Sequence, residues 1–130
     1  MNLTSKKIIL EQSKKESFTF LSDPSNYKQL MPDSTKKFEL NDKGGFIFQL
    51  SGMPEIRLKL QEKTPDDRIV WSSASEQFKF SLAGEINEIS ESQSEIQFVF
   101  NGDFNPMMAM MIKNPLTKFI NTLSDNLKKV

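Results

Sequence analysis

The sequence contains neither cysteine nor histidine. Without cysteine, the chain has no disulfide bond and no thiolate that could act as a nucleophile or metal ligand. Without histidine, it lacks the side chain that ordinarily titrates near neutral pH, and catalytic triads of the Ser-His-Asp kind are excluded. Metal sites would need carboxylate ligands alone. An enzyme would have to use Asp, Glu, Lys or Tyr as acid and base, so enzymatic activity is the less favoured interpretation.

An excess of charge of one sign is also lacking, because 17 Lys and Arg residues balance 17 Asp and Glu residues. Nucleic acids and anionic membranes attract basic proteins, so we expect neither as the main partner. No segment approaches the about 20 apolar residues that a membrane-spanning helix needs. The N-terminal segment MNLTSKKIILEQSKK lacks the apolar core and cleavage site of a secretory signal. We therefore expect a cytoplasmic protein with no stable membrane insertion.

The length of the chain, 130 residues, suits one domain with one core, and we treat residues 1–130 as a single domain. Its 37% apolar content includes eleven phenylalanines, each of which can bury a large area. The segment 3–12 contains the apolar cluster Ile8, Ile9 and Leu10 in polar surroundings. This pattern predicts the first strand.

Signals for two short helices follow the first strand. Ser13 and Glu16 have the S-x-x-E spacing of a capping box, which predicts a helix ending near residue 22. Asp23 and Pro24 are typical of the N-cap and first position of a second helix, which Pro32 would end.

Between residues 38 and 100 the period of the apolar residues changes to two, which predicts strands with one buried face. Six successive strands joined by short polar turns, such as 41–45, 64–67 and 90–94, favour an antiparallel meander. The residues expected to face the core are Phe38, Leu40, Phe46, Phe48, Leu50, Ile56, Leu58, Leu60, Ile69, Trp71, Phe78, Phe80, Leu82, Gly84, Ile86, Ile96, Phe98 and Phe100. Asn101-Gly102 is typical of a hairpin turn, and a bulge near the strand end is an equal alternative.

The last segment predicts a long helix. Asn105 suits its N-cap, Pro106 its first position, and apolar residues three or four apart continue to Leu127. Pro115 cannot donate to the carbonyl of Met111, so we expect either a kink or two helices, the second capped by Asn114.

These elements predict an α+β fold: a curved seven-stranded antiparallel sheet wrapped around the long C-terminal helix, with two short helices after strand 1. The first strand would join the edge of the meander. One helix is only about 10 Å across and cannot fill the concave face of such a sheet. We therefore expect space near one end of the helix.

Three segments resemble the START-like (SRPBCC) superfamily, whose members have the helix-grip fold. FTFLSDPSNYKQLMP at 18–32 is similar to the first helix pair of these proteins. GMPEIRLKLQEKTP at 52–65 and FNPMMAMMIKNPLTKFINTLSDNL at 104–127 resemble a compact, uncharacterised bacterial subgroup. The resemblance spans nearly the whole chain and implies the fold described above.

The superfamily typically binds an apolar molecule between the sheet and the long helix. By position, the resemblance implies a ligand-binding lining of Phe48, Leu58, Trp71, Phe80, Phe98, Met107, Met108 and Met111. It transfers no catalytic residue, because no acid–base set matches this chain, and we expect no metal and no cofactor.

Four methionines within five positions, at 107, 108, 110 and 111, leave several interpretations open. Methionine fills irregular gaps and adapts to changing partners. The cluster suits a gap-filling core, an adaptable pocket mouth or a docking surface for a protein. Its place at the helix start, beside the expected kink, favours the pocket mouth.

The leading functional hypothesis is non-enzymatic binding or carriage of a small hydrophobic molecule, such as a lipid, an isoprenoid or a polyketide. One alternative is a protein-interaction module that uses the methionine-rich helix start. The other is a cyclase-like enzyme with a carboxylate or Tyr27 as acid and base. Tyr27 is otherwise expected to pack the two short helices together, and Trp71 to pack in the core with its N–H bonded to an acceptor or a ligand.

Overall fold

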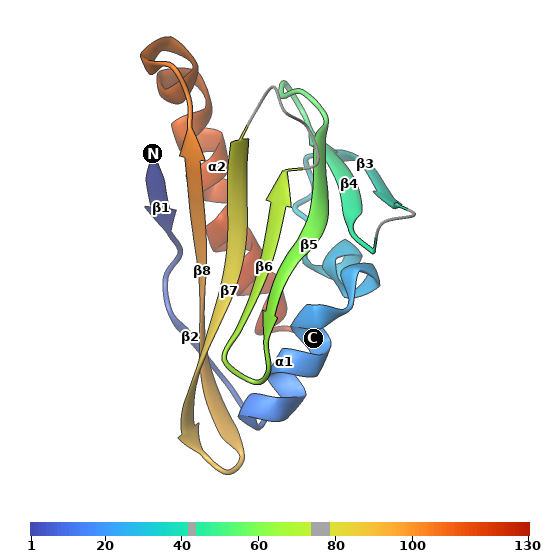
Figure 1. Ribbon diagram of the computed structural model, residues 1–130, viewed down its shortest axis with the longest axis vertical. Coiled ribbons are helices and arrows are strands. Elements are labelled where there is room, and N and C mark those ends of the chain that lie inside the picture. The colour runs from blue at the N-terminus through green and yellow to red at the C-terminus, as the bar shows by residue number, and fades with distance from the viewer. Residues whose placement is uncertain (42–43, 74–78) are drawn as a thin grey trace.

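A computed structural model of the chain describes residues 1–41, 44–73 and 79–130. An N-terminal strand segment and two short helices precede a run of strands and one long helix (Figure 1). In chain order the elements are β1 (Asn2–Thr4), β2 (Ile8–Leu10), α1 (Lys14–Ser22), the 3₁₀ helix η1 (Pro24–Leu30), β3 (Thr35–Leu40), β4 (Phe46–Leu50), β5 (Ile56–Thr64), β6 (Arg68–Ser73), β7 (Lys79–Ser90), β8 (Gln93–Asp103) and α2 (Pro106–Leu127).

The strands form one antiparallel sheet with the order β1-β8-β7-β6-β5-β4-β3, and β2 also pairs with β8. β3 to β8 are therefore the expected meander, and the N-terminal segment joins its edge. This segment is two short strands rather than one. Between them Ser5 still bonds to β8: its N–H donates to the Phe98 carbonyl at 2.8 Å, and its Oγ accepts from the Phe98 N–H at 2.9 Å. The fold class is α+β, as predicted.

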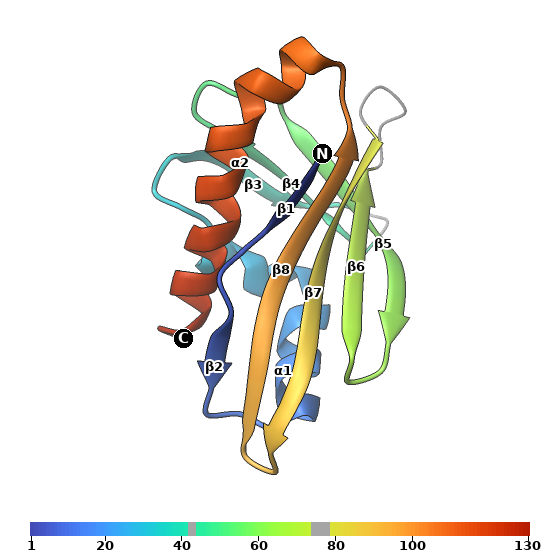
Figure 2. The same ribbon diagram turned by 90° about the vertical axis from the view of Figure 1, so that its left-hand side faces the viewer.

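Three helices cover one face of the sheet (Figure 2). α2 runs along this face, while α1 and η1 lie beside its C-terminal half. The Asn126 side chain links α2 to η1, because its Nδ2 donates to the carbonyl of Leu30 at 2.9 Å.

The two short helices begin as their capping signals predict. Ser13 Oγ accepts from the Glu16 N–H at 3.1 Å, and Glu16 Oε1 accepts from the Ser13 N–H at 3.1 Å, which completes the capping box. Asp23 caps η1 by accepting from the N–H of Ser25 at 3.0 Å.

Replacing Ser13 with alanine should lower the free energy of unfolding by about 1 kcal/mol, because one helix donor loses its acceptor. Urea denaturation would measure this loss. Ser13→Thr, which keeps the hydroxyl, should lose only a few tenths of a kcal/mol, and equal losses in both variants would contradict the capping argument.

The core contains the inward faces of the strands and the second half of α2. In β4 the expected alternation is complete: Phe46, Phe48 and Leu50 are buried, and the residues between them are half-buried. Phe48 stacks on Phe119 of α2 with ring centroids 4.8 Å apart and planes 12° apart, so this pair joins the helix to the sheet.

Some strand residues differ from the prediction. Leu60 is exposed because β4 pairs with β5 only as far as Leu58, and the β5 register shifts after Leu60. Leu40 is exposed at the end of the edge strand β3. Asn101 and Gly102 form neither a turn nor a bulge, since both pair in regular register with β7. Phe78 and part of the expected turn at 41–45 lie outside the described residues.

α2 continues through Pro115 as one helix, so the alternative of two separate helices is wrong. Its first turns contribute no buried residue, and burial begins at Leu116. Asn105 Oδ1 accepts from the Met108 N–H at 2.8 Å and caps the start as expected. The N-terminal part of the longest helix therefore lies beyond the closely packed core.

Candidate ligand-binding groove

A hollow of about 430 Å³ lies between the start of α2 and the sheet. We call it the groove. Its lining comes from three parts of the chain: the connection from β4 into β5, the neighbouring ends of β7 and β8, and the first half of α2. The lining residues are Ser51, Gly52, Met53, Pro54, Glu55, Ile56, Arg57, Phe80, Phe100, Phe104, Met108, Met111, Ile112, Pro115 and Leu116.

Three phenylalanines form an aromatic wall of the groove. Phe80 and Phe100 are stacked with ring centroids 5.4 Å apart, and Phe104 stacks against both at 6.5 and 6.4 Å. Phe100 is buried, whereas Phe80 and Phe104 are half-buried and present ring surface to the groove. A flat aromatic ligand could extend this stack with the offset geometry that aromatic pairs prefer.

Gly102 makes the position of Phe104 possible. A Cβ atom at residue 102 would collide with the Cε2 atom of the Phe104 ring and would lie 3.1 Å from Cβ of Phe80. The absence of a side chain therefore lets the Phe104 ring fold back over the end of β8, beside the other two rings.

The helix provides a flexible wall. Met108 and Met111 are three residues apart and both line the groove, as Ile112 and Pro115 do. Pro115 has no N–H with which to continue the helical hydrogen bonding, and helices commonly bend at such a residue. Thioethers pack favourably against aromatic rings, so the two walls suit each other and an apolar ligand between them.

Charge occurs at one rim of the groove, where Glu55 and Arg57 flank Ile56. Glu55 accepts from Lys37 Nζ at 2.8 Å and from Arg57 Nε at 2.9 Å. These hydrogen bonds, chiefly that from Lys37, hold the pKa of the Glu55 carboxyl below its usual range. Among the described residues that line the groove, Glu55 is the single carboxylate, and it is ionised and paired at neutral pH.

No protein-family model matches the sequence, and no curated protein matches it. Solved structures do match over nearly the whole chain. A START superfamily protein from Mycobacterium smegmatis superposes with a TM-score of 0.67 and 14% identity, covering 98% of this chain and 94% of that one. Norcoclaurine synthase from Thalictrum flavum, in complex with dopamine and hydroxybenzaldehyde, gives a TM-score of 0.70 and 12% identity, covering 99% and 86%. The KanY protein superposes with a TM-score of 0.78 and 9% identity, covering 99% of this chain and 95% of that one.

The chain has the START-like fold. The sheet that wraps around a long C-terminal helix is the helix-grip arrangement that the sequence resemblance implied. At identities of 14% or less, the likeness concerns the fold.

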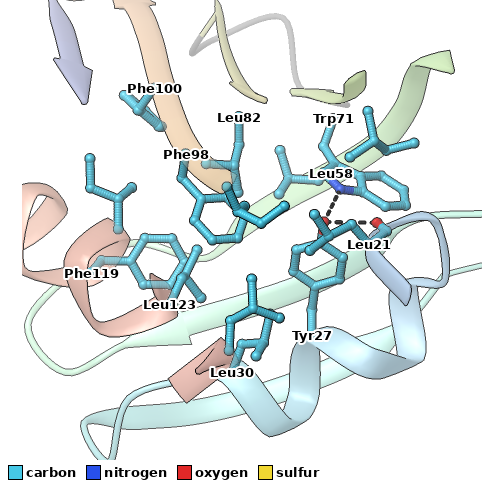
Figure 3. Packing of buried hydrophobic residues seen from close by; sticks show 14 of the residues in the cluster. Leu21, Tyr27, Leu30, Leu58, Trp71, Leu82, Phe98, Phe100, Phe119 and Leu123 are labelled. Atoms are coloured by element: carbon cyan, nitrogen blue, oxygen red, sulfur yellow. Dashed lines mark hydrogen bonds between the residues drawn. The ribbon is translucent and has the colours of Figure 1, made fainter. Parts of the chain in front are cut away.

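Within this START-like fold, the eight residues predicted to bind a ligand fall into three groups. Phe80, Met108 and Met111 line the groove. Phe48, Leu58, Trp71 and Phe98 are buried in the core and are absent from the lining. Figure 3 shows Leu58, Trp71 and Phe98 packed among other buried side chains. Met107 is exposed and is not a lining residue either. The groove thus lies at the N-terminal end of α2, beyond the packed centre in which the four core residues lie.

Trp71 and Tyr27 are joined by a hydrogen bond in the core of the START-like fold. Trp71 Nε1 donates to the hydroxyl of Tyr27 at 3.0 Å, and that hydroxyl donates to the carbonyl of Leu21 at 2.8 Å (Figure 3). Burial raises the pKa of Tyr27 far above its ordinary value. Tyr27 is fully buried and lies outside the groove lining, so it packs α1 against η1 as predicted.

Two further observations concern metal sites and membrane-spanning helices. In residues 1–41, 44–73 and 79–130, no group of three or more Asp and Glu side chains is arranged to hold a metal ion. Across the same residues, the helices are all too short or too polar to span a bilayer.

Proposed function

We propose that the chain binds and carries a small apolar molecule in the groove, without catalysing a reaction on it. The observation that supports this most directly is the combination of a hollow of about 430 Å³ with an aromatic wall and a methionine wall. Small-molecule sites are typically concave, mostly apolar, and about 300–1,000 Å³ in volume. The groove meets these criteria at the small end of the range.

The size and lining favour one class of ligand. A volume in this range suits a molecule with one or two rings or a single short chain better than a two-chain lipid. The stacked rings of Phe80, Phe100 and Phe104 favour a flat aromatic portion. The bound dopamine and hydroxybenzaldehyde of the norcoclaurine synthase structure are both aromatic, which supports the same choice.

The charged rim supports carriage rather than catalysis. A general acid must hold a proton at working pH, but the lowered pKa of Glu55 leaves this carboxyl ionised near neutrality. Both of its oxygens already accept hydrogen bonds from Lys37 or Arg57. Tyr27, the other group of the enzyme alternative, is buried with its hydroxyl in use.

The proposal can be tested with N-phenyl-1-naphthylamine, a neutral aromatic probe whose fluorescence rises in apolar surroundings. Met111→Glu should weaken its binding by about tenfold or more, because a carboxylate at the groove would be desolvated by the probe. Both Met111 and Met110 are mostly exposed, at 72% and 82%, but only Met111 lines the groove. Met110→Glu is therefore the matched control and should bind the probe as the unmodified chain does.

Two outcomes would contradict the proposal. One is failure of the unmodified chain to bind the probe, and the other is an equal loss of affinity in Met110→Glu and Met111→Glu. Because the probe is neutral, a selective effect of Met111→Glu cannot come from charge attraction to the probe. Native mass spectrometry and organic extraction of the purified protein would then identify the natural ligand.

A further inference from the structure

Exposed methionine side chains are concentrated at one edge of the groove. Met107, Met110 and Met111 are 75%, 82% and 72% exposed, and we call these three and Met108 the methionine patch. The other methionines, Met1, Met31 and Met53, are partly buried and pack against the core. Because the chain has no cysteine, thioethers are its only oxidisable sulfur.

We propose that the methionine patch is an oxidation site through which peroxide releases the ligand of the groove. The inference rests on the proposed function. In the reaction, a sulfur lone pair attacks one oxygen of hydrogen peroxide, an S–O bond forms and the O–O bond breaks. The thioether is oxidised to a sulfoxide, and the peroxide is reduced to water.

Exposure directs the reaction to the patch. Oxidation of methionine follows the access of the oxidant to sulfur. Three of the four patch methionines are more than 70% exposed. None of the four is buried, and the burial of α2 begins only at Leu116. Peroxide can therefore reach this part of the helix without any opening of the core.

The consequence of oxidation falls on the ligand. Met108 and Met111 line the groove together with the three phenylalanines. A sulfoxide is polar, so an apolar ligand would have to desolvate it without supplying a hydrogen bond in return. Because none of the four patch methionines is buried, the same change should leave the fold intact.

The use of methionine rather than leucine in this wall also indicates a role for the sulfur atom. Leucine has about the same volume, favours helices equally and usually replaces methionine with little effect on packing. A wall that only had to be apolar could use leucine or isoleucine, as Ile112 and Leu116 do beside it. A thioether adds reversible oxidation, since methionine sulfoxide reductases restore the original side chain.

The test treats the purified protein with increasing hydrogen peroxide and follows three quantities. Peptide mass spectrometry should show Met107, Met110 and Met111 oxidised several times faster than Met31 and Met53. The affinity for N-phenyl-1-naphthylamine should fall by about fivefold or more, while the melting temperature stays the same. Treatment with the two methionine sulfoxide reductases should restore binding, because each reduces one sulfoxide epimer.

Paired leucine variants separate the two patch methionines that line the groove from the two that do not. In Met108→Leu/Met111→Leu, the affinity for the probe, whatever its starting value, should no longer change at peroxide doses that leave Met53, the third methionine of the lining, unoxidised. Met107→Leu/Met110→Leu is the matched control, and it should bind the probe as the unmodified chain does and remain sensitive to peroxide.

The possible failures are distinguishable. If the untreated protein does not bind the probe, the proposed function is wrong and the release mechanism falls with it. If it binds the probe and keeps its affinity after Met108 and Met111 are oxidised, only the release mechanism is wrong. If Met31 and Met53 oxidise as fast as the patch, the assignment of the site is wrong.

Discussion

Replacing Phe119 with alanine is expected to lower the free energy of unfolding by about 3–5 kcal/mol. The Phe119 ring is buried and stacks on Phe48, with centroids 4.8 Å apart and planes 12° apart. Truncation would remove the buried ring and leave a cavity between α2 and β4. The surroundings can collapse only partly, because Leu116, Ile120 and Leu123 on the same helix are themselves buried. Urea denaturation followed by circular dichroism would measure the loss.

Lys118→Ala is the matched control, since Lys118 is exposed on the same turn of α2. Its expected effect is within about 0.5 kcal/mol, as for most surface substitutions. Phe119→Leu keeps most of the buried volume and should lose clearly less than Phe119→Ala. If Phe119→Ala cost less than about 1 kcal/mol, the Phe48–Phe119 pair would not be what joins the helix to the sheet.

The parts of the fold that were predictable from the sequence depend on local physics. A two-residue period determines which side chains share a face, and in β4 it identified the buried Phe46, Phe48 and Leu50. The S-x-x-E spacing at Ser13 identified the start of α1, because a capping box involves only neighbouring residues. The exposure of Leu60 within β5 was not predictable in this way, since it depends on where β4 stops pairing.

The location of the groove was predictable only in part. Alternation placed Phe48, Trp71 and Phe98 on the inner face of the sheet, but it carries no information on which part of that face the helices fill. In the structure, side chains of α2 and η1 cover the central part of this face, as the Phe48–Phe119 and Tyr27–Trp71 contacts show. The groove lies away from this packed part, beneath the first half of α2.

The sequence does contain signals for this groove. The first half of α2, up to Pro115, has four methionines where a core-facing helix would show branched or aromatic residues. Phe100 and Phe104 flank Gly102, and a glycine inside a strand often marks a close approach of other atoms. In the structure the close neighbour is the Phe104 ring. Single-sequence periodicity does not show this contact, because it forms after the chain leaves β8.

Tyr27→Phe should lower the free energy of unfolding by about 2–4 kcal/mol at neutral pH, although it removes a single oxygen atom. The variant would leave the Trp71 N–H without its acceptor and the Leu21 carbonyl without its donor, both in the core. Each unsatisfied buried group costs about 1–3 kcal/mol. The aromatic packing would remain, since the Tyr27 ring stacks on Phe46 at 4.9 Å through its faces. Urea denaturation followed by the fluorescence of Trp71, the single tryptophan, would measure the effect.

Thr117→Val is a control that also removes a hydroxyl without changing the shape of the side chain. The Thr117 hydroxyl donates to the carbonyl of Lys113 at 2.7 Å, but at an exposed position. Water can replace this hydrogen bond, so the expected loss is within about 0.5 kcal/mol. Equal losses in Tyr27→Phe and Thr117→Val would contradict the view that burial makes the Tyr27 hydroxyl important.

The same hydroxyl gives the stability a dependence on alkaline pH whose sign follows from its burial. Burial raises the pKa of Tyr27 in the folded protein, whereas in the unfolded chain the phenol ionises near pH ~10. Above that pH the folded state binds more protons than the unfolded state, so the Tyr27 contribution is complete below about pH 10 and is lost as the pH rises. The loss approaches about 1.4 kcal/mol per pH unit.

Tyr27→Phe lacks this contribution, and the difference in free energy of unfolding between the two proteins should narrow by about 2 kcal/mol at pH 11.5. Ion-paired Lys14 and Lys37, whose pKa values are also raised, occur in both proteins and cancel in the comparison. Parallel stability curves between pH 9 and 11.5 would show that the Tyr27 phenol is not kept protonated by the fold.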